Sequence, residues 1–157
     1  MPGKIADLIK AARISELSMR ENVVVEPKTP LAEVYRLMDE EDFSAVVVCS
    51  GDKAVGIFSQ RDILYRTALE APEPSTPIEQ LMTTDPVTLS IDDGLAEAIK
   101  VMVEGGYRHI PILDDKRCTT GILTSREILR YIADQMPETV LNMPPRLHQE
   151  LHRPEGG

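Results

Sequence analysis

Internal repetition is the feature of this sequence that most restricts how it can fold. Aligning Ile14 with Ile78, and allowing one extra residue in the second copy, gives 14 identities over the 56 positions from 14 to 69. Most of these identities fall on periodic apolar positions or on one shared turn, so chance explains them poorly. Because a unit of this length buries little surface alone, the two copies are expected to pack into one body.

Both copies predict the same order of elements, with short strands alternating with helix-length patterns. Copy one predicts strands at 23–25, 46–49 and 55–58, a helix that begins after Thr29, and a second helix at 60–69. Copy two predicts strands at 87–89, 110–113 and 120–123, a helix that begins after Asp93, and a second helix at 125–134. Thr29 and Asp93 are the expected N-caps. This alternation places the chain in the α/β (α+β) class with small sheets.

The pattern divides the chain into five segments. They are an N-terminal helix (1–13), a first repeat (14–70), a proline-rich linker (71–77), a second repeat (78–135) and an extended C-terminal tail (136–157). Three prolines make the linker stiff, and further prolines keep the tail from forming a helix.

Composition and charge exclude several classes of partner. A net charge of −9 and an aromatic content of 4% argue against nucleic acid, because phosphate backbones need a basic surplus and single strands need stacking surfaces. No apolar run has the length of a membrane span. Cys49 and Cys118 lack the spacing of a disulfide framework or a zinc site. We therefore expect a cytoplasmic protein with reduced thiols, no metal site and no membrane partner.

One turn occurs in both copies and leads from a strand into a helix. It reads Gly-Ile-Phe-Ser-Gln-Arg-Asp at 56–62 and Gly-Ile-Leu-Thr-Ser-Arg-Glu at 121–127. Ser59 and Thr124 are good N-caps, and Asp62 and Glu127 complete capping boxes, which is the more common role of such a pattern. The same geometry can place a hydroxyl and free N–H groups against a phosphate, and a carboxylate against ribose hydroxyls. Capping and ligand binding can coexist, so both roles stay open.

A second candidate site lies just before the strand at 110–113. Arg108 can bind phosphate oxygens in a bidentate manner, and His109 can add a hydrogen-bond donor. The alternative is a solvated arginine beside a capping histidine. Ser44 and Ala45 occupy the equivalent positions of copy one, so the two copies are unequally equipped for an anion. No nucleophile with a base partner and no Gly-rich phosphate loop is visible, and enzyme chemistry is therefore not predicted.

These motifs together resemble a tandem cystathionine-β-synthase (CBS) domain pair, also called a Bateman module. The resemblance covers roughly 14–133 and rests on the twin turns, on DPVTLS at 85–90 and on YRHIPIL at 107–113. It implies two β-α-β-β-α repeats that pack through their small sheets as one stand-alone module, with two clefts between them. Such a module is non-catalytic and acts as a sensor of adenosyl ligands.

The resemblance also implies roles for particular residues. Asp62 and Glu127 would hold ribose hydroxyls, although Glu127 stands where the family has Asp, and Ser59 and Thr124 would face phosphate. Arg108 and His109 resemble the family's phosphate-contacting pair. Adenine would lie against backbone near the first strands, around Val23, Val24, Val87 and Thr88.

The function expected from this resemblance is regulatory. An adenine nucleotide (AMP, ADP, ATP or NAD) would serve as regulatory ligand, no cofactor would act as catalyst, and a conformational change would signal to an unidentified partner protein. The protein is expected to be a homodimer whose four repeats form a flat disc. The alternative is a ligand-free scaffold for oligomerisation or interaction. Proximity in sequence assigns Arg108 and His109 to the cleft of Thr124, which is therefore expected to bind phosphorylated ligands more tightly than the cleft of Ser59.

Overall fold

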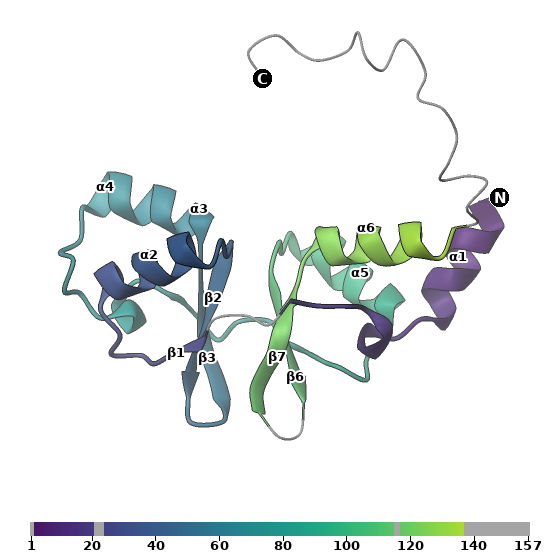
Figure 1. The fold of residues 1–157 in the computed structure, drawn as a ribbon, viewed down its shortest axis with the longest axis horizontal. Coiled ribbons are helices and arrows are strands. Elements are labelled where there is room, and N and C mark those ends of the chain that lie inside the picture. Colours follow the sequence, from purple (N-terminus) through teal and green to yellow (C-terminus); the bar gives the residue numbers. More distant parts are fainter. Residues whose placement is uncertain (1, 21–23, 115–116, 137–157) are drawn as a thin grey trace, which may run out of the picture.

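A computed structural model of the chain describes residues 2–20, 24–114 and 117–136 (Figure 1). They form two small α/β bodies whose hairpins lie side by side at the centre, with the helices on the outside (Figure 1). The predicted C-terminal tail lies, apart from Met136, outside the described residues.

The first body contains a four-stranded sheet in the order β1-β2-β3-β4. Its strands are β1 (Val24–Val25), β2 (Ala45–Ser50), β3 (Lys53–Ser59) and β4 (Thr83–Thr84). Its helical elements are α2 (Leu31–Glu40), α3 (Gln60–Asp62), the π-helical turn η2 (Ile63–Thr67), α4 (Ala68–Glu70) and the 3-10 turn η3 (Ile78–Gln80). The helix predicted at 60–69 is therefore present, but its middle is widened into a π turn.

The second body repeats this arrangement around a three-stranded sheet in the order β5-β6-β7. Its strands are β5 (Leu89–Ser90), β6 (Ile110–Asp114) and β7 (Arg117–Leu123). Its helical elements are α1 (Pro2–Ala11), the 3-10 turn η1 (Ile14–Glu16), α5 (Leu95–Gly105) and α6 (Ser125–Asp134). In both bodies the first strand pairs parallel with the second, and the second pairs antiparallel with the third. The predicted fold class is confirmed, whereas the strand predicted at 87–89 begins two residues later.

The start of each sequence repeat packs into the body formed by the other repeat. Ile14 and Leu17 belong to the apolar core of the second body, and Ile78 and Leu81 belong to the core of the first. Two reciprocal backbone hydrogen bonds fix this exchange, from Ile14 N to Asp93 O (2.9 Å) and from Ile78 N to Thr29 O (2.8 Å). The sequence repeats and the structural bodies therefore do not coincide.

The two bodies meet through their sheets. Strand β2 is apolar at consecutive positions because both of its faces are covered. Val46 and Val48 point into the core of the first body, while Val47 and Cys49 lie on the opposite face, where Ile122 of β7 packs against them. The predicted packing through small sheets is thereby observed.

Cys49 differs from its expected chemical state. It is joined in a disulfide, so the expectation of a reduced thiol is wrong at this position. The side chain of Cys118 lies outside the described residues. Of the helices in the described part of the chain, none is both long and apolar enough to cross a membrane.

Candidate functional site

Both acid-bearing turns form the capping boxes predicted from sequence. Ser59 N donates to Asp62 Oδ2 over 2.8 Å, and Thr124 N donates to Glu127 Oε2 over the same distance. The hydroxyl of Thr124 in turn accepts from Arg126 N (3.2 Å), at the start of α6. These bonds fix each acid beside the end of its strand, and each engages only one oxygen of the carboxylate. The other oxygen can therefore accept from a bound hydroxyl.

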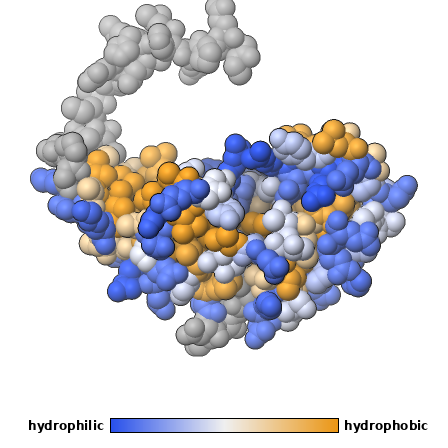
Figure 2. All heavy atoms as spheres, turned by 180° about the vertical axis from the view of Figure 1, so that it is seen from behind, coloured by the Kyte–Doolittle hydropathy of each residue, from blue (hydrophilic) through white to orange (hydrophobic). Residues whose placement is uncertain are grey.

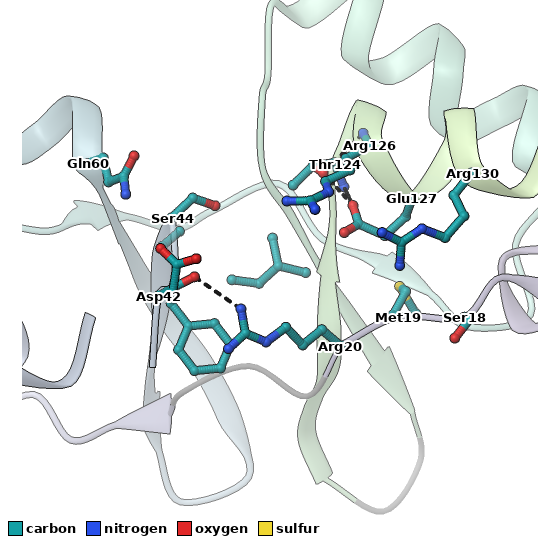
Figure 3. Close-up of a pocket in the computed structure, with 13 residues that line it drawn as sticks. Ser18, Met19, Arg20, Asp42, Ser44, Gln60, Thr124, Arg126, Glu127 and Arg130 are labelled. Atoms are coloured by element: carbon teal, nitrogen blue, oxygen red, sulfur yellow. Dashed lines mark hydrogen bonds between the residues drawn. The ribbon is translucent and has the colours of Figure 1, made fainter. Parts of the chain in front are cut away.

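A pocket opens between the two bodies at each turn. The first, here called the Thr124 pocket, has a volume of about 540 Å³. It is lined by Ser18, Met19, Arg20, Asp42, Phe43, Ser44, Ala45, Gln60, Ile122, Thr124, Arg126, Glu127 and Arg130 (Figure 3). The second, here called the Ser59 pocket, has a volume of about 620 Å³. It is lined by Ser44, Ile57, Ser59, Gln60, Arg61, Asp62, Leu64, Tyr65, Thr83, Gly106, Tyr107, Arg108 and His109. Both volumes lie in the range of roughly 300–1,000 Å³ that is usual for small-molecule sites.

Each pocket combines the turn of one repeat with the segment before the second strand of the other repeat. Arg108 and His109 therefore line the Ser59 pocket, together with Asp62. The assignment by proximity in sequence, which placed them beside Thr124, is wrong. It fails because the segment before β6 and the turn after β3, which belong to different repeats, line the same pocket.

His109 lines the Ser59 pocket and hydrogen-bonds to a residue of the other repeat. Its Nε2 is 3.0 Å from the hydroxyl oxygen of Ser44, a residue that lines both pockets. The pKa of His109 lies below its usual value, chiefly because the side chain is partly buried. The positive charge of Arg108 lowers this pKa further, whereas the negative charges of Glu127 and Asp62 partly offset the effect. The net lowering of the pKa favours the neutral imidazole of His109, which can donate one hydrogen bond.

The Thr124 pocket contains a cluster of arginines that sequence reasoning missed. Arg20 follows the segment that packs on the second body, yet its guanidinium donates to the carbonyls of Glu41 and Asp42 in the first (3.0 Å to Asp42) and lies over the Phe43 ring. Arg126 and Arg130 project from α6 on the opposite wall of the pocket (Figure 3). No local motif marks these residues, because an arginine on a polar helix face is ordinarily solvated.

The predicted adenine-contacting residues are placed as follows. Val24 lies in β1, and Val87 and Thr88 lie just before β5. They line neither of the two pockets as described, and Val23 lies outside the described residues. Their role stays a prediction.

Comparison with known proteins adds independent observations. Residues 14–68 and 78–134 match the family model described as CBS domain. The chain is 30% identical over 125 residues to a 17.7 kDa protein of Acidianus ambivalens, covering 79% of this chain and 75% of the relative. It spans smaller shares of relatives from Methanopyrus kandleri (28% identical, 78% of this chain, 63% of the relative) and Methanocaldococcus jannaschii (27% identical, 80% of this chain, 41% of the relative).

Solved structures share the fold. A conserved protein from Pyrococcus horikoshii superposes with a TM-score of 0.70 at 29% identity, covering 82% of this chain and 96% of that one. A CBS domain protein from Pyrobaculum aerophilum, solved in complex with AMP, gives a TM-score of 0.67 at 23% identity, covering 78% and 99%. A CBS domain pair solved with 5′-methylthioadenosine and S-adenosyl-L-methionine gives 0.69 at 20% identity, covering 80% and 98%.

Proposed function

The chain belongs to the CBS domain family, and from this premise we propose that it is a regulatory module that binds adenine nucleotides in its two pockets. The observation that carries the proposal is the composition of the Ser59 pocket. It brings a carboxylate held by a capping box, Asp62, together with the cation Arg108 of the other repeat. A carboxylate that accepts two hydroxyls and an arginine that binds an anion are the groups a nucleoside phosphate requires.

Each functional group has a proposed role. Asp62 and Glu127 accept from the ribose hydroxyls with the carboxylate oxygen that the capping bond does not use. Arg108 binds phosphate in the Ser59 pocket, and the hydroxyl of Ser59 or Thr124 faces the same group. His109 adds a hydrogen bond to the bound ligand. Relatives of this fold solved with AMP or with S-adenosyl-L-methionine support an adenosyl ligand.

The proposed mode of signalling uses the position of the pockets between the two bodies. Because each pocket is lined by both bodies, a bound nucleotide contacts both and favours the relative orientation that fits it best. This shift in population can be read by a partner protein, and no chemistry on the ligand is required. CBS domain pairs are generally regulatory modules. The rival proposal, a scaffold with empty pockets, does not account for the carboxylate and the arginine that meet in the Ser59 pocket.

Isothermal titration calorimetry tests this proposal. AMP, ADP, ATP or NAD should release or absorb heat with saturation, whereas GTP and CTP should give little. A ligand present at one hundred times its dissociation constant should also stabilise the fold by about 2.7 kcal/mol, visible as a raised unfolding temperature. If no adenosyl compound gives heat or stabilisation, the scaffold is the correct reading.

We also propose that two chains associate through their outer helices. The second helix of each repeat exposes an equivalent leucine, Leu64 (71% exposed) and Leu129 (69% exposed). On the face shown in Figure 2, hydrophobic side chains gather over the second body, where α5 exposes 76% of Val103. A second copy of the chain that packs against these helices would bury their exposed apolar side chains and so stabilise the dimer. Sedimentation equilibrium at micromolar concentration should give the mass of a dimer, and a monomer mass at every concentration would contradict the proposal.

A further inference from the structure

The Thr124 pocket carries two arginines on consecutive turns of one helix. Arg126 and Arg130 are four residues apart on α6, which places their side chains on one face about 6 Å apart at Cβ. Both line the pocket that holds Thr124 and Glu127, and both lie on its α6 wall (Figure 3). Two neighbouring guanidinium groups aimed at one pocket favour a ligand with more than one anionic group.

Neither arginine stabilises its own helix through an ion pair. Two arginines of the first body pair with an acid four residues later, as Arg36–Glu40 and Arg66–Glu70. Arg126 and Arg130 form no such pair within the described part of the chain. Arg126 also lies in the first turn of α6, where the helix dipole disfavours a cation. A bound anion would give both arginines a partner of opposite charge. It would also offset the unfavourable interaction between Arg126 and the helix dipole.

The equivalent positions of the first repeat are arranged differently. Arg61 and Tyr65 line the Ser59 pocket there, and the guanidinium of Arg61 lies over the Tyr65 ring, 5.4 Å from its centre. An aromatic ring thus stands where the Thr124 pocket has its second arginine. The turn and helix of the second repeat therefore place two arginines at the Thr124 pocket, whereas those of the first repeat place one arginine at the Ser59 pocket.

Of the two acidic residues that line the Thr124 pocket, Asp42 lies across from the arginines, whereas Glu127 lies on α6 with them. Asp42 belongs to the first body, and Figure 3 shows it across the pocket from Arg126 and Arg130, beside Arg20. Glu127 is held by Thr124 in the capping box and has the ribose role under the proposed function. With two arginines against one carboxylate, the α6 wall carries a net positive charge and is the side of the pocket to which a chain of phosphates is attracted.

We propose that the Thr124 pocket selects adenosine carrying two or three phosphates, with Arg126 and Arg130 binding the phosphates beyond the first. The Ser59 pocket, with Arg108 as its cation for the first phosphate, does not make this distinction. This inference rests on the proposed function, because it assumes that Glu127 and Thr124 receive the nucleoside and its first phosphate. The occupancy of the two pockets in one protein would then depend on the concentration of ADP or ATP relative to that of AMP.

The test measures the affinities of AMP, ADP and ATP by calorimetry, in EDTA, with the Ser59 pocket disabled by Asp62→Ala. ATP should bind at least roughly tenfold more tightly than AMP, because hydrogen bonds to charged groups are among the stronger ones. Adding Arg126→Ala and Arg130→Ala should bring the two affinities within about threefold of each other. The matched control, Arg36→Ala, removes an arginine from a helix outside both pockets and should leave the ratio unchanged.

The outcomes separate this inference from the function beneath it. If AMP binds but the ATP-to-AMP ratio is near one, or survives the loss of both arginines, the inference is overturned and the proposed function stands. If inorganic triphosphate competes as strongly as ATP, the arginines form an anion site without a nucleoside, and the inference is again overturned. If no adenine nucleotide binds the unaltered protein, the proposed function fails and the inference fails with it. Unfolding temperatures without ligand verify that each variant is folded.

Discussion

Arg108→Ala is expected to weaken AMP binding roughly tenfold in the pocket of Asp62 and to leave the pocket of Glu127 almost unchanged. The reason is geometric, since Arg108 lines the Ser59 pocket and is absent from the lining of the Thr124 pocket. Adenosine, which has no phosphate, should lose little affinity in the same variant.

Two single-pocket backgrounds make this prediction measurable by calorimetry. Glu127→Ala leaves only the Ser59 pocket, and Arg108→Ala added to it should lower AMP affinity roughly tenfold. Asp62→Ala leaves only the Thr124 pocket, and the same addition should change the affinity less than about twofold. The opposite pattern would mean that Arg108 acts with the turn of its own repeat, as proximity in sequence suggests, and the cross-repeat pairing would be wrong.

Ile14→Ala is expected to destabilise the second body, although this residue opens the first sequence repeat. Ile14 is fully buried in a core that includes Leu95, Ile110 and Leu123. Removing such a side chain from a packed core costs about 2–5 kcal/mol, because the cavity closes only in part. Ile78→Ala is the matched change in the first body, whose core includes Phe58 and Val46.

Native-state hydrogen exchange distinguishes the two variants. Amides of β6 and β7 should lose more protection in Ile14→Ala, and amides of β2 and β3 should lose more in Ile78→Ala. Faster exchange in β2 and β3 of the Ile14 variant would show that the start of each repeat packs within its own repeat after all.

Local structure was largely predictable from the sequence. The capping boxes at Ser59 and Thr124 form as predicted, because all the groups they need lie within four residues of chain. The apolar run of β2 has its expected place, since only a strand covered on both faces tolerates consecutive buried residues. Helix α6 has the predicted bounds.

What could not be predicted depends on contacts between the repeats. The repeat pattern indicates that Ile14 and Ile78 are buried. It does not indicate in which of the two similar cores each residue is buried. The predicted N-caps fail for the same reason. Pro30 and Gly94 are the N-caps of α2 and α5. The first helical amides, those of Leu31 and Leu95, donate to the carbonyls of Thr76 and Ala12, which lie just before the repeat starts at Ile78 and Ile14. Tertiary bonds thus replace the local caps that Thr29 and Asp93 would have supplied.

In the candidate site, too, the local motifs were predictable from the sequence, and the contacts between the repeats were not. Its acids were found because they repeat within a motif, and Arg108 was found because it precedes a strand. Arg126 and Arg130 were missed, since a charged residue on a helix has no local feature that distinguishes a ligand contact from a solvated face. Their place in a pocket depends on the opposing wall, which the other repeat supplies.

A crystal structure of the protein soaked with AMP tests the central claim most directly. The account predicts nucleotide density between the two bodies, with the ribose hydroxyls within hydrogen-bond distance of Asp62 and the phosphate within reach of Arg108. Pockets that stay empty at saturating AMP, or AMP bound away from both turns, would contradict it.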